Sequence, residues 1–200
     1  MHETAPLATQ AWESFYVIVG SSAGALTGLQ FVVLTLITEA GLLRGNSDTL
    51  AAFGSPNVFH FCVALLVSAV FSAPWTSLGP PGIAVAATGL VGLVYSIYVI
   101  AVASRQTDYK PVLEDWVWHA GLPIAAYAAL VHSGYRIAEG SPDTMYVAGG
   151  ATLLLVFIGI HNAWDTVTYV TAERAKAHRA KMAEAARAKA TEAPKAAPPA

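Results

Sequence analysis

Long apolar runs separated by short polar connections dominate this sequence and restrict the folds open to it. A hydrocarbon core about 30 Å thick is crossed by a helix of about 20 mostly apolar residues. In hydrocarbon every backbone N–H and C=O needs a partner, and a helix of that length supplies all of them internally. We therefore predict an all-α, polytopic transmembrane bundle of five helices. The five runs are residues 15–38, 56–75, 82–103, 116–136 and 145–167.

The composition agrees with a membrane protein. Charged residues make up 12% of the chain and apolar residues 55%, whereas a soluble domain typically carries about 25% charged residues. Cys62 is the only cysteine, so the fold does not depend on an internal disulfide, and we expect a small buried apolar residue there. No basic segment precedes the first run, which is also too long for a signal peptide, so we expect it to stay as a membrane helix.

The connections and the ends of the runs fit this division. Residues 45–48, 79–82 and 140–143 are short and rich in Gly, Pro, Asn and Asp, which interrupt helices. Amphipathic aromatic rings favour the headgroup layers. In the predicted topology, Trp12, Tyr16, Trp75, Tyr135 and Tyr146 lie at the outer ends of helices, and Trp116, Trp118, Trp164 and Tyr169 lie at the inner ends.

The basic residues predict the orientation. Cytoplasmic segments of membrane proteins carry an excess of Lys and Arg. With the N-terminus outside and the C-terminus inside, ten of the eleven Lys and Arg residues lie in the cytoplasm and only Arg136 lies outside. We therefore predict a multi-pass protein of a bacterial cytoplasmic (inner) membrane. The ten are Arg44, Arg105, Lys110, Arg174, Lys176, Arg179, Lys181, Arg187, Lys189 and Lys195.

Two parts follow from the change in composition near residue 170. Residues 1–170 form the predicted transmembrane domain, and residues 171–200 form a basic, Ala-rich cytoplasmic tail. Ala, Lys, Arg and Glu favour helix, so the last helix should continue to about Ala190, and the closing residues should be disordered. We interpret the tail charges mainly as solvated stop-transfer residues, with docking on anionic lipid as the alternative.

Small residues spaced four apart indicate close helix packing. Gly20, Gly24 and Gly28 lie on one stripe of the first run, and glycines allow two helix backbones to approach closely in lipid. The third run has a similar stripe. The partner can be another helix of the chain, a second copy in a homo-oligomer, or a different membrane protein. The residues of the second stripe are Ala84, Thr88 and Gly92.

Residues 20–24 also match the G-x-S-x-G pattern of serine hydrolases. That pattern works only as a strained turn between a strand and a helix, whereas here it falls inside a predicted membrane helix. We therefore do not interpret Ser22 as a nucleophile. The sequence contains no other catalytic motif, no phosphate-binding loop and no nucleic-acid-binding patch. These observations favour a non-enzymatic protein whose surroundings are the lipid bilayer.

The most informative polar residues are three histidines and an aspartate. Counting 1.5 Å per residue from the middle of each run places His60, His119 and His161 about 8 to 10 Å to the cytoplasmic side of the midplane. Asp165 shares a face with His161, and we expect this face, which also carries Gly150, to point into the bundle. Pro123 removes the normal bond to the His119 carbonyl, so we expect an irregular helix at the same depth.

Three interpretations of this polar set stay open. The histidines can be packing residues satisfied by carbonyls or by neighbouring polar side chains, which is the favoured interpretation. They can bind a transition metal or a haem, with Asp165 as a ligand or as the acceptor that orients His161. They can also form a proton or ion pathway, because ionisable groups at membrane depth often mark one.

Three segments resemble a known group of proteins. They are the Gly- and Ala-rich stretch 15–37, the stretch 52–75, and the ending Gly-Ile-His-Asn-Ala-Trp-Asp-Thr-Val-Thr-Tyr at 159–169. Together they resemble small bacterial membrane proteins whose last helix ends in Asn-Ala-Trp-Asp and which have no assigned activity. The resemblance covers about residues 12–170 and implies the five-helix topology, without adding a catalytic residue.

Overall fold

The computed structural model describes residues 5–39, 47–103 and 116–192, which fold almost entirely as helices. The predicted all-α class is confirmed, and no strand occurs among these residues. The predictions for Arg44, Arg105, Lys110 and residues 45–46 and 193–200 lie outside them. The elements are α1 (Ala5–Glu39), α2 (Ser47–Ser72), α3 (Gly79–Ala103), the π-helical turn η1 (Val117–Gly121), α5 (Leu122–Ala138), the 3-10 turn η2 (Pro142–Thr144) and α6 (Met145–Glu192).

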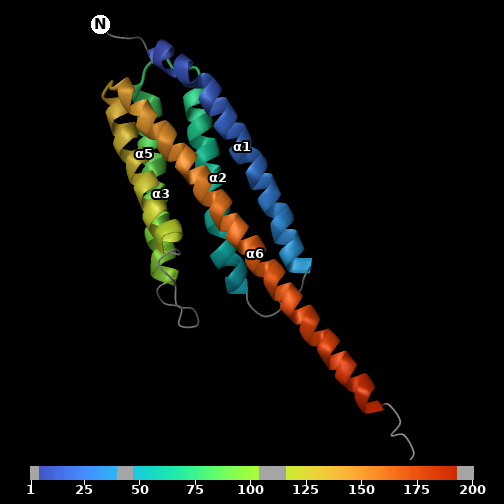
Figure 1. Ribbon diagram of the computed structural model, residues 1–200. Helices are drawn as coiled ribbons and strands as arrows, with labels where there is room; N and C mark the ends of the chain where they lie inside the picture. The colour runs from blue at the N-terminus through green and yellow to red at the C-terminus, as the bar shows by residue number, and fades with distance from the viewer. Residues whose placement is uncertain (1–4, 40–46, 104–115, 193–200) are drawn as a thin grey trace, which may run out of the picture.

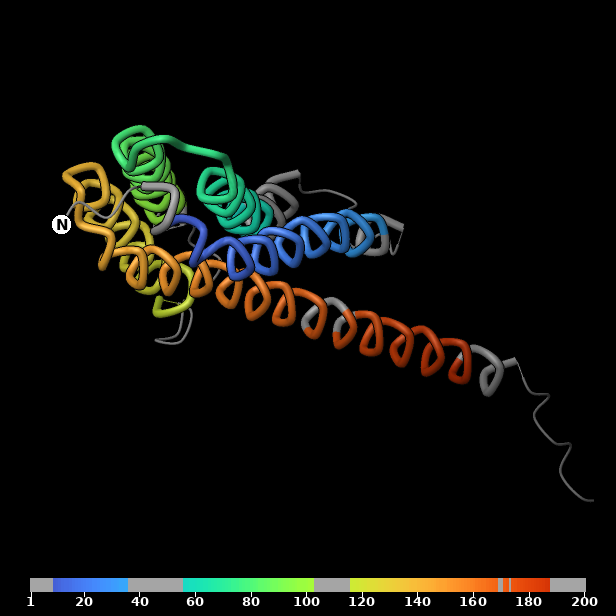
Figure 2. The backbone as a smooth tube through the Cα atoms, turned by 90° about the horizontal axis from the view of Figure 1, so that it is seen from above, coloured from blue at the N-terminus to red at the C-terminus, as the bar shows by residue number. Residues whose placement is uncertain are grey.

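The helices form two pairs with a long helix lying across both. α1 packs along α2, and α3 packs along α5, as Figure 1 shows. α6 contacts α2 and α5 and then continues well beyond the ends of the other helices (Figure 2). The side chains described between residues 171 and 187 of this extension are all exposed. The helical continuation expected for the last run is therefore present.

Three stretches are long and apolar enough to cross a membrane: Thr9–Thr35, Gly79–Val102 and Pro142–Thr168. The apolar part of α2, Pro56–Ser72, is shorter. Large apolar side chains are exposed on the outer faces of these helices, as expected where lipid replaces water. Ile18, Phe31, Ile83, Val94 and Phe157, for example, are each more than half exposed.

Several helices begin earlier than the apolar runs predicted. The Gly-Pro-Pro-Gly segment 79–82 is the first turn of α3 rather than a connection. Proline is tolerated there because the first N–H groups of a helix have no internal partner in any case. α2 likewise begins at Ser47, with Pro56 inside it. The turn at 140–143 is confirmed, and Gly140 has a φ of 88°, a left-handed conformation that favours glycine.

The closest backbone contact in the bundle joins α3 and α5. A Cβ at Gly134 would lie 2.7 Å from the Gly82 carbonyl oxygen and would also clash with the backbone of Ala86. A Cβ at Gly89 would lie 2.8 Å from the Val131 nitrogen. These glycines allow the two backbones to touch, which is how helices associate in lipid without a hydrophobic driving force between them. The predicted stripe identified neither Gly82 nor Gly89.

The predicted glycine stripes are only partly used for packing within the chain. A Cβ at Gly20 would lie 2.8 Å from the Ser68 Cβ, so Gly20 belongs to the contact between α1 and α2. Apart from the adjoining backbone of α1 itself, no described atom lies within 4 Å of a Cβ built at Gly24 or Gly28. On α3, Gly92 packs against the Tyr127 ring. The Thr88 hydroxyl donates to the Ala84 carbonyl of its own helix at 2.8 Å.

An aromatic cluster joins the start of α1 to the start of α6. The Trp12 and Tyr146 rings meet edge to face, with centroids 4.8 Å apart. The Tyr16 and Phe71 centroids are also 4.8 Å apart, and both side chains are fully buried. Tyr16 therefore belongs to the core of the bundle, in contrast to the predicted headgroup position, because α2 and α6 cover it at this end.

The face of α6 that points into the bundle differs from the predicted one. Gly150 is exposed and no described atom lies near it, whereas its neighbour Gly149 packs against Trp12 and Phe15. The face of α6 that points inward is therefore one residue, or about 100°, away from the predicted face. Asp165 accordingly has a half-exposed side chain. The inward face includes Thr152, Leu155, Gly159 and Asn162.

The contact between α3 and α5 predicts the effect of adding one methyl group. Gly134→Ala should lower the free energy of unfolding by about 1–3 kcal/mol, because the new Cβ meets backbone atoms that cannot move aside. The unfolding of purified protein in mixed micelles would measure this change. Gly150→Ala is the matched control, since it adds the same group to an open position on a helix. An equal effect of both substitutions would contradict the close contact.

Candidate functional site: a buried histidine and aromatic layer

His60 and Tyr127 form a buried hydrogen-bonded pair between α2 and α5. The His60 Nδ1 and the Tyr127 hydroxyl oxygen are 2.6 Å apart. His60 is 3% exposed and Tyr127 is fully buried. Polar groups at this depth are costly unless they are paired, so the contact stabilises both side chains. It also fixes the rotation of α2 relative to α5.

Three helices hold the Tyr127 ring in place. The absence of a side chain at Gly92 of α3 leaves the space that the ring fills. Phe59 of α2 stacks on Tyr95 of α3 with centroids 4.0 Å apart, and it also meets Tyr127 edge to face. The glycine on α3 therefore positions the hydroxyl that meets His60 on α2. Sequence reasoning did not identify Tyr127, although its helix carries the predicted His119.

The irregular helix expected near Pro123 is present as the π-helical turn η1. Val117–Gly121 is wound with bonds to the fifth residue back, and the Leu122 N–H donates to the Val117 carbonyl. Pro123 has no N–H to donate, so the regular pattern cannot continue through this turn. Single π-turns of this kind often occur at functional positions. The turn carries Trp118 and His119 on one side of the bundle.

His119 lies in this π-turn and is partly buried. The neighbouring Trp118 stacks on His161 of α6, with ring centroids 3.7 Å apart and planes inclined by 16°. The π-turn therefore packs against α6. That the three histidines share one depth stays a prediction.

His161 also approaches Asp165 one turn further along α6. Its Nε2 is 3.1 Å from the Asp165 Oδ2, which is an ion-pair distance, although the orientation does not make a hydrogen bond. The His161 side chain is 26% exposed and that of Asp165 is 52% exposed. His161 and Asp165 are therefore partly exposed at the surface of the bundle, whereas His60 is buried inside it.

Asn162 is a buried polar residue that the sequence does not identify as part of the site. It is 2% exposed, and neither atom of its amide group has a hydrogen-bond partner among the described residues. It lies one turn beyond Gly159, which packs against Phe61 of α2. The inward position of Asn162 follows from the same rotation of α6 that exposes Asp165.

Of the four predicted site residues, the structure pairs His161 with Asp165. His60 instead pairs with Tyr127, and His161 also stacks on Trp118. Among the described residues no three His, Cys, Asp or Glu side chains are placed to hold a metal ion. The metal, haem and proton-pathway interpretations stay predictions. The contacts themselves are those of a polar layer that fixes helix positions.

Two other sequence interpretations can be compared with the structure. Ser22 lies in the middle of the uninterrupted helix α1, so the G-x-S-x-G pattern does not form a turn. Cys62 is exposed rather than buried, and it lines a groove between α2 and α3. Its position on the outer face of α2 is compatible with an apolar side chain in lipid.

Comparison of the chain with protein-family models, with curated proteins and with solved structures finds no match. Its function therefore has to be argued from its own residues, and the resemblance to bacterial proteins that end in Asn-Ala-Trp-Asp stays an expectation.

The pair of His60 and Tyr127 can be tested by removing one oxygen atom. Tyr127→Phe should lower the free energy of unfolding by about 1 kcal/mol, because the His60 Nδ1 then stays buried without a partner. A double-mutant cycle with His60→Leu would measure the coupling. Tyr98→Phe, at an exposed position of α3, is the control and should have no effect. Additive effects of Tyr127→Phe and His60→Leu would contradict the hydrogen bond.

Proposed function

We propose that the chain is a five-span, non-enzymatic integral protein of a bacterial cytoplasmic membrane, with its N-terminus outside and its C-terminus inside. The observation that carries this proposal is the apolar outer surface of the bundle. Ile18 of α1, Ile83 of α3 and Phe157 of α6 are exposed to the surroundings on three different helices. A surface of this kind is stable in lipid, whereas a soluble monomer rarely exposes large apolar patches.

The lengths and contacts of α2 and α5 support five crossings rather than three. α2 has 26 residues and is about 39 Å long. η1 and α5 together have 22 residues and are about 33 Å long. α2 packs against α1, α3 and α6, and α5 packs against α3 and α6. Because α2 and α5 pack against helices that are long and apolar enough to cross a membrane, α2 and α5 should cross it as well.

The positions of the two ends support the orientation. The contact between Trp12 and Tyr146 places the start of α1 and the start of α6 at the same end of the bundle. α6 then runs to the opposite end, where its charged extension leaves the bundle (Figure 1). An odd number of crossings gives this arrangement. The basic residues of the extension belong in the cytoplasm by the positive-inside rule.

Reporter fusions test the topology. Alkaline phosphatase, which is active only in the periplasm, should be inactive when it is fused after Glu192. The same enzyme fused within the turn at Ser141, between α5 and α6, should be active. Green fluorescent protein, which fluoresces in the cytoplasm, should give the opposite pair of results. A phosphatase signal at the end of α6 would contradict the proposed orientation.

We further propose that two copies associate through the face of α1 that carries Gly24 and Gly28. Gly20, one turn earlier on the same stripe, packs against Ser68 within the chain, whereas the next two glycines have no described neighbour. The glycines of α3 and α5 show that this bundle uses such residues for close backbone contact. An open stripe of the same kind on an exposed helix supports a contact with a second copy.

A leucine in the stripe tests this association. Gly24→Leu should raise the dissociation constant of the dimer by about tenfold, which corresponds to about 1.4 kcal/mol. Crosslinking and light scattering in detergent would measure it. Gly150→Leu is the matched control, because Gly150 also has no described neighbour but lies on α6. A wild-type protein that is monomeric at all concentrations would refute the proposal, as would equal effects of the two leucines.

A further inference from the structure

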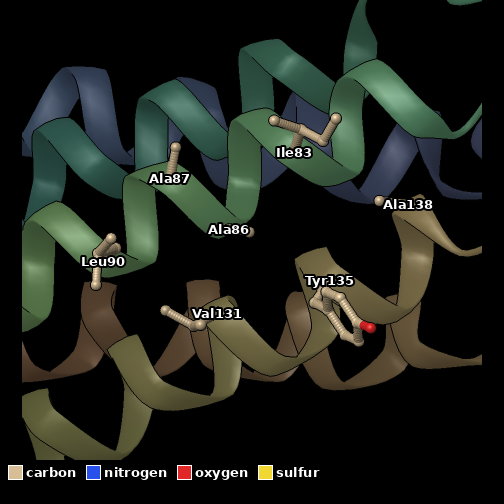
Figure 3. A pocket seen from close by; sticks show the side chains of 7 residues that line it. All are labelled: Ile83, Ala86, Ala87, Leu90, Val131, Tyr135 and Ala138. Carbon is tan, nitrogen blue, oxygen red and sulfur yellow. The ribbon is translucent and has the colours of Figure 1, made fainter.

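An apolar groove runs along the outer face of the contact between α3 and α5. It has a volume of about 360 Å³ and is lined by Ile83, Ala87 and Leu90 of α3 and by Val131, Tyr135 and Ala138 of α5. Figure 3 shows these side chains along the two helices. The groove follows from the glycine contact beneath it, because backbones that touch leave a narrow channel between the side chains on either side.

An exposed ion pair lies at the C-terminal end of α5, where its residues alternate in the chain with two that line the groove. The Arg136 guanidinium lies 3.0 Å from the Glu139 carboxylate, and both side chains are almost half exposed. The Tyr135 side chain is exposed at the same end of α5. Tyr135 and Ala138 line the groove and are the chain neighbours of Arg136 and Glu139 respectively. An apolar channel and a pair of opposite charges therefore meet at the end of α5.

We propose that this groove and ion pair form a binding site for one zwitterionic phospholipid with a primary ammonium headgroup. One acyl chain would lie in the groove, with the phosphate on Arg136 and the ammonium group on Glu139. The proposal rests on the membrane insertion of α3 and α5, because only then does the groove extend from the headgroup layer into the hydrocarbon. From Ala138 to Val131 it extends about 10 Å along α5.

Charge complementarity selects this headgroup among common phospholipids. A guanidinium group binds phosphate oxygens in a bidentate manner. A carboxylate accepts hydrogen bonds from a primary ammonium, and the negative end of the helix dipole at the end of α5 adds to the attraction. A choline headgroup has no N–H to donate. A glycerol headgroup brings no positive charge to Glu139 and leaves the net negative charge of the lipid beside it.

Native mass spectrometry of the purified full-length chain tests the site. The protein would be released from nanodiscs that contain equal amounts of phosphatidylethanolamine, phosphatidylcholine and phosphatidylglycerol. Phosphatidylethanolamine should be retained about tenfold more than the other two lipids. Arg136→Gln and Glu139→Gln should each remove this preference. Arg179→Gln, on the exposed extension of α6, should leave it unchanged.

Filling the groove provides an independent test. Ala87 is exposed, so Ala87→Leu should lower the retention of all three lipids at this site by about tenfold without unfolding the bundle. Ala87 also lines the groove between α2 and α3, so Thr88→Leu, which fills only that second groove, is one control. Ala128→Leu, an exposed position of α5 outside both grooves, is the other.

The outcomes distinguish this proposal from the one on which it rests. Equal retention of the three lipids, or full retention by Ala87→Leu, would overturn the lipid site while the topology reporters still showed insertion. A change of oligomeric mass on Ala87→Leu, without a change in bound lipid, would assign the groove to a second copy and would also overturn it. Failure of insertion would appear first in the topology reporters.

Discussion

Backbone contact between α3 and α5 is the constraint on which the rest of the bundle depends. In lipid the helices gain little from burying apolar side chains against one another, so close packing between small residues has to hold them together. Gly82 and Gly134 provide that packing at one end of the pair, and Gly89 and Gly92 continue it. The Tyr127 ring lies directly on Gly92, and its hydroxyl reaches His60 on α2. The apolar packing of one pair of helices thereby determines a polar contact to the other pair.

The polar layer and the lipid-facing groove are two sides of the same packing. On the inner side, the α3–α5 contact directs Tyr127 toward the centre of the bundle. On the outer side, it leaves the channel that Ile83 and Val131 border. A larger residue at one of the contact glycines would separate the helices, and it would disturb the buried hydrogen bond and the groove together. A substitution at a contact glycine should therefore disturb both the hydrogen bond and the groove. A substitution at a residue of only one of these features should leave the other unchanged.

The all-α class and the approximate positions of the helices could be predicted from the sequence, because apolar runs of this length favour helices. The boundaries were less accurate, since proline at the start of α3 was interpreted as a break although a first turn accepts it. Spacing also shows which residues share a face without showing where the face points. For that reason Gly24 and Gly28 were correctly grouped with Gly20, while only Gly20 has a neighbour within the chain.

The candidate site shows the same limit. Counting residues placed the three histidines at one level, and Pro123 predicted the irregular turn that holds His119. Tyr127 and Trp118 were not identified as partners, because an aromatic residue in an apolar run is indistinguishable by sequence from one that faces lipid. The inward face of α6 lies one residue away from the predicted face. As a result, Asn162 is buried, whereas Asp165, which was predicted to point inward, is half-exposed. Which polar residue is buried depends on a rotation that spacing alone does not determine.

The continuity of α6 has a mechanical consequence. The helix runs from Met145 to Glu192 without a break, so the part beyond Thr168 is an arm about 36 Å long that continues a stretch long and apolar enough to cross a membrane. If the span tilts by about 10°, the far end of the arm is displaced by about 6 Å along an arc. A small tilt of α6 within the bundle is thus amplified into a larger movement at the far end of the arm.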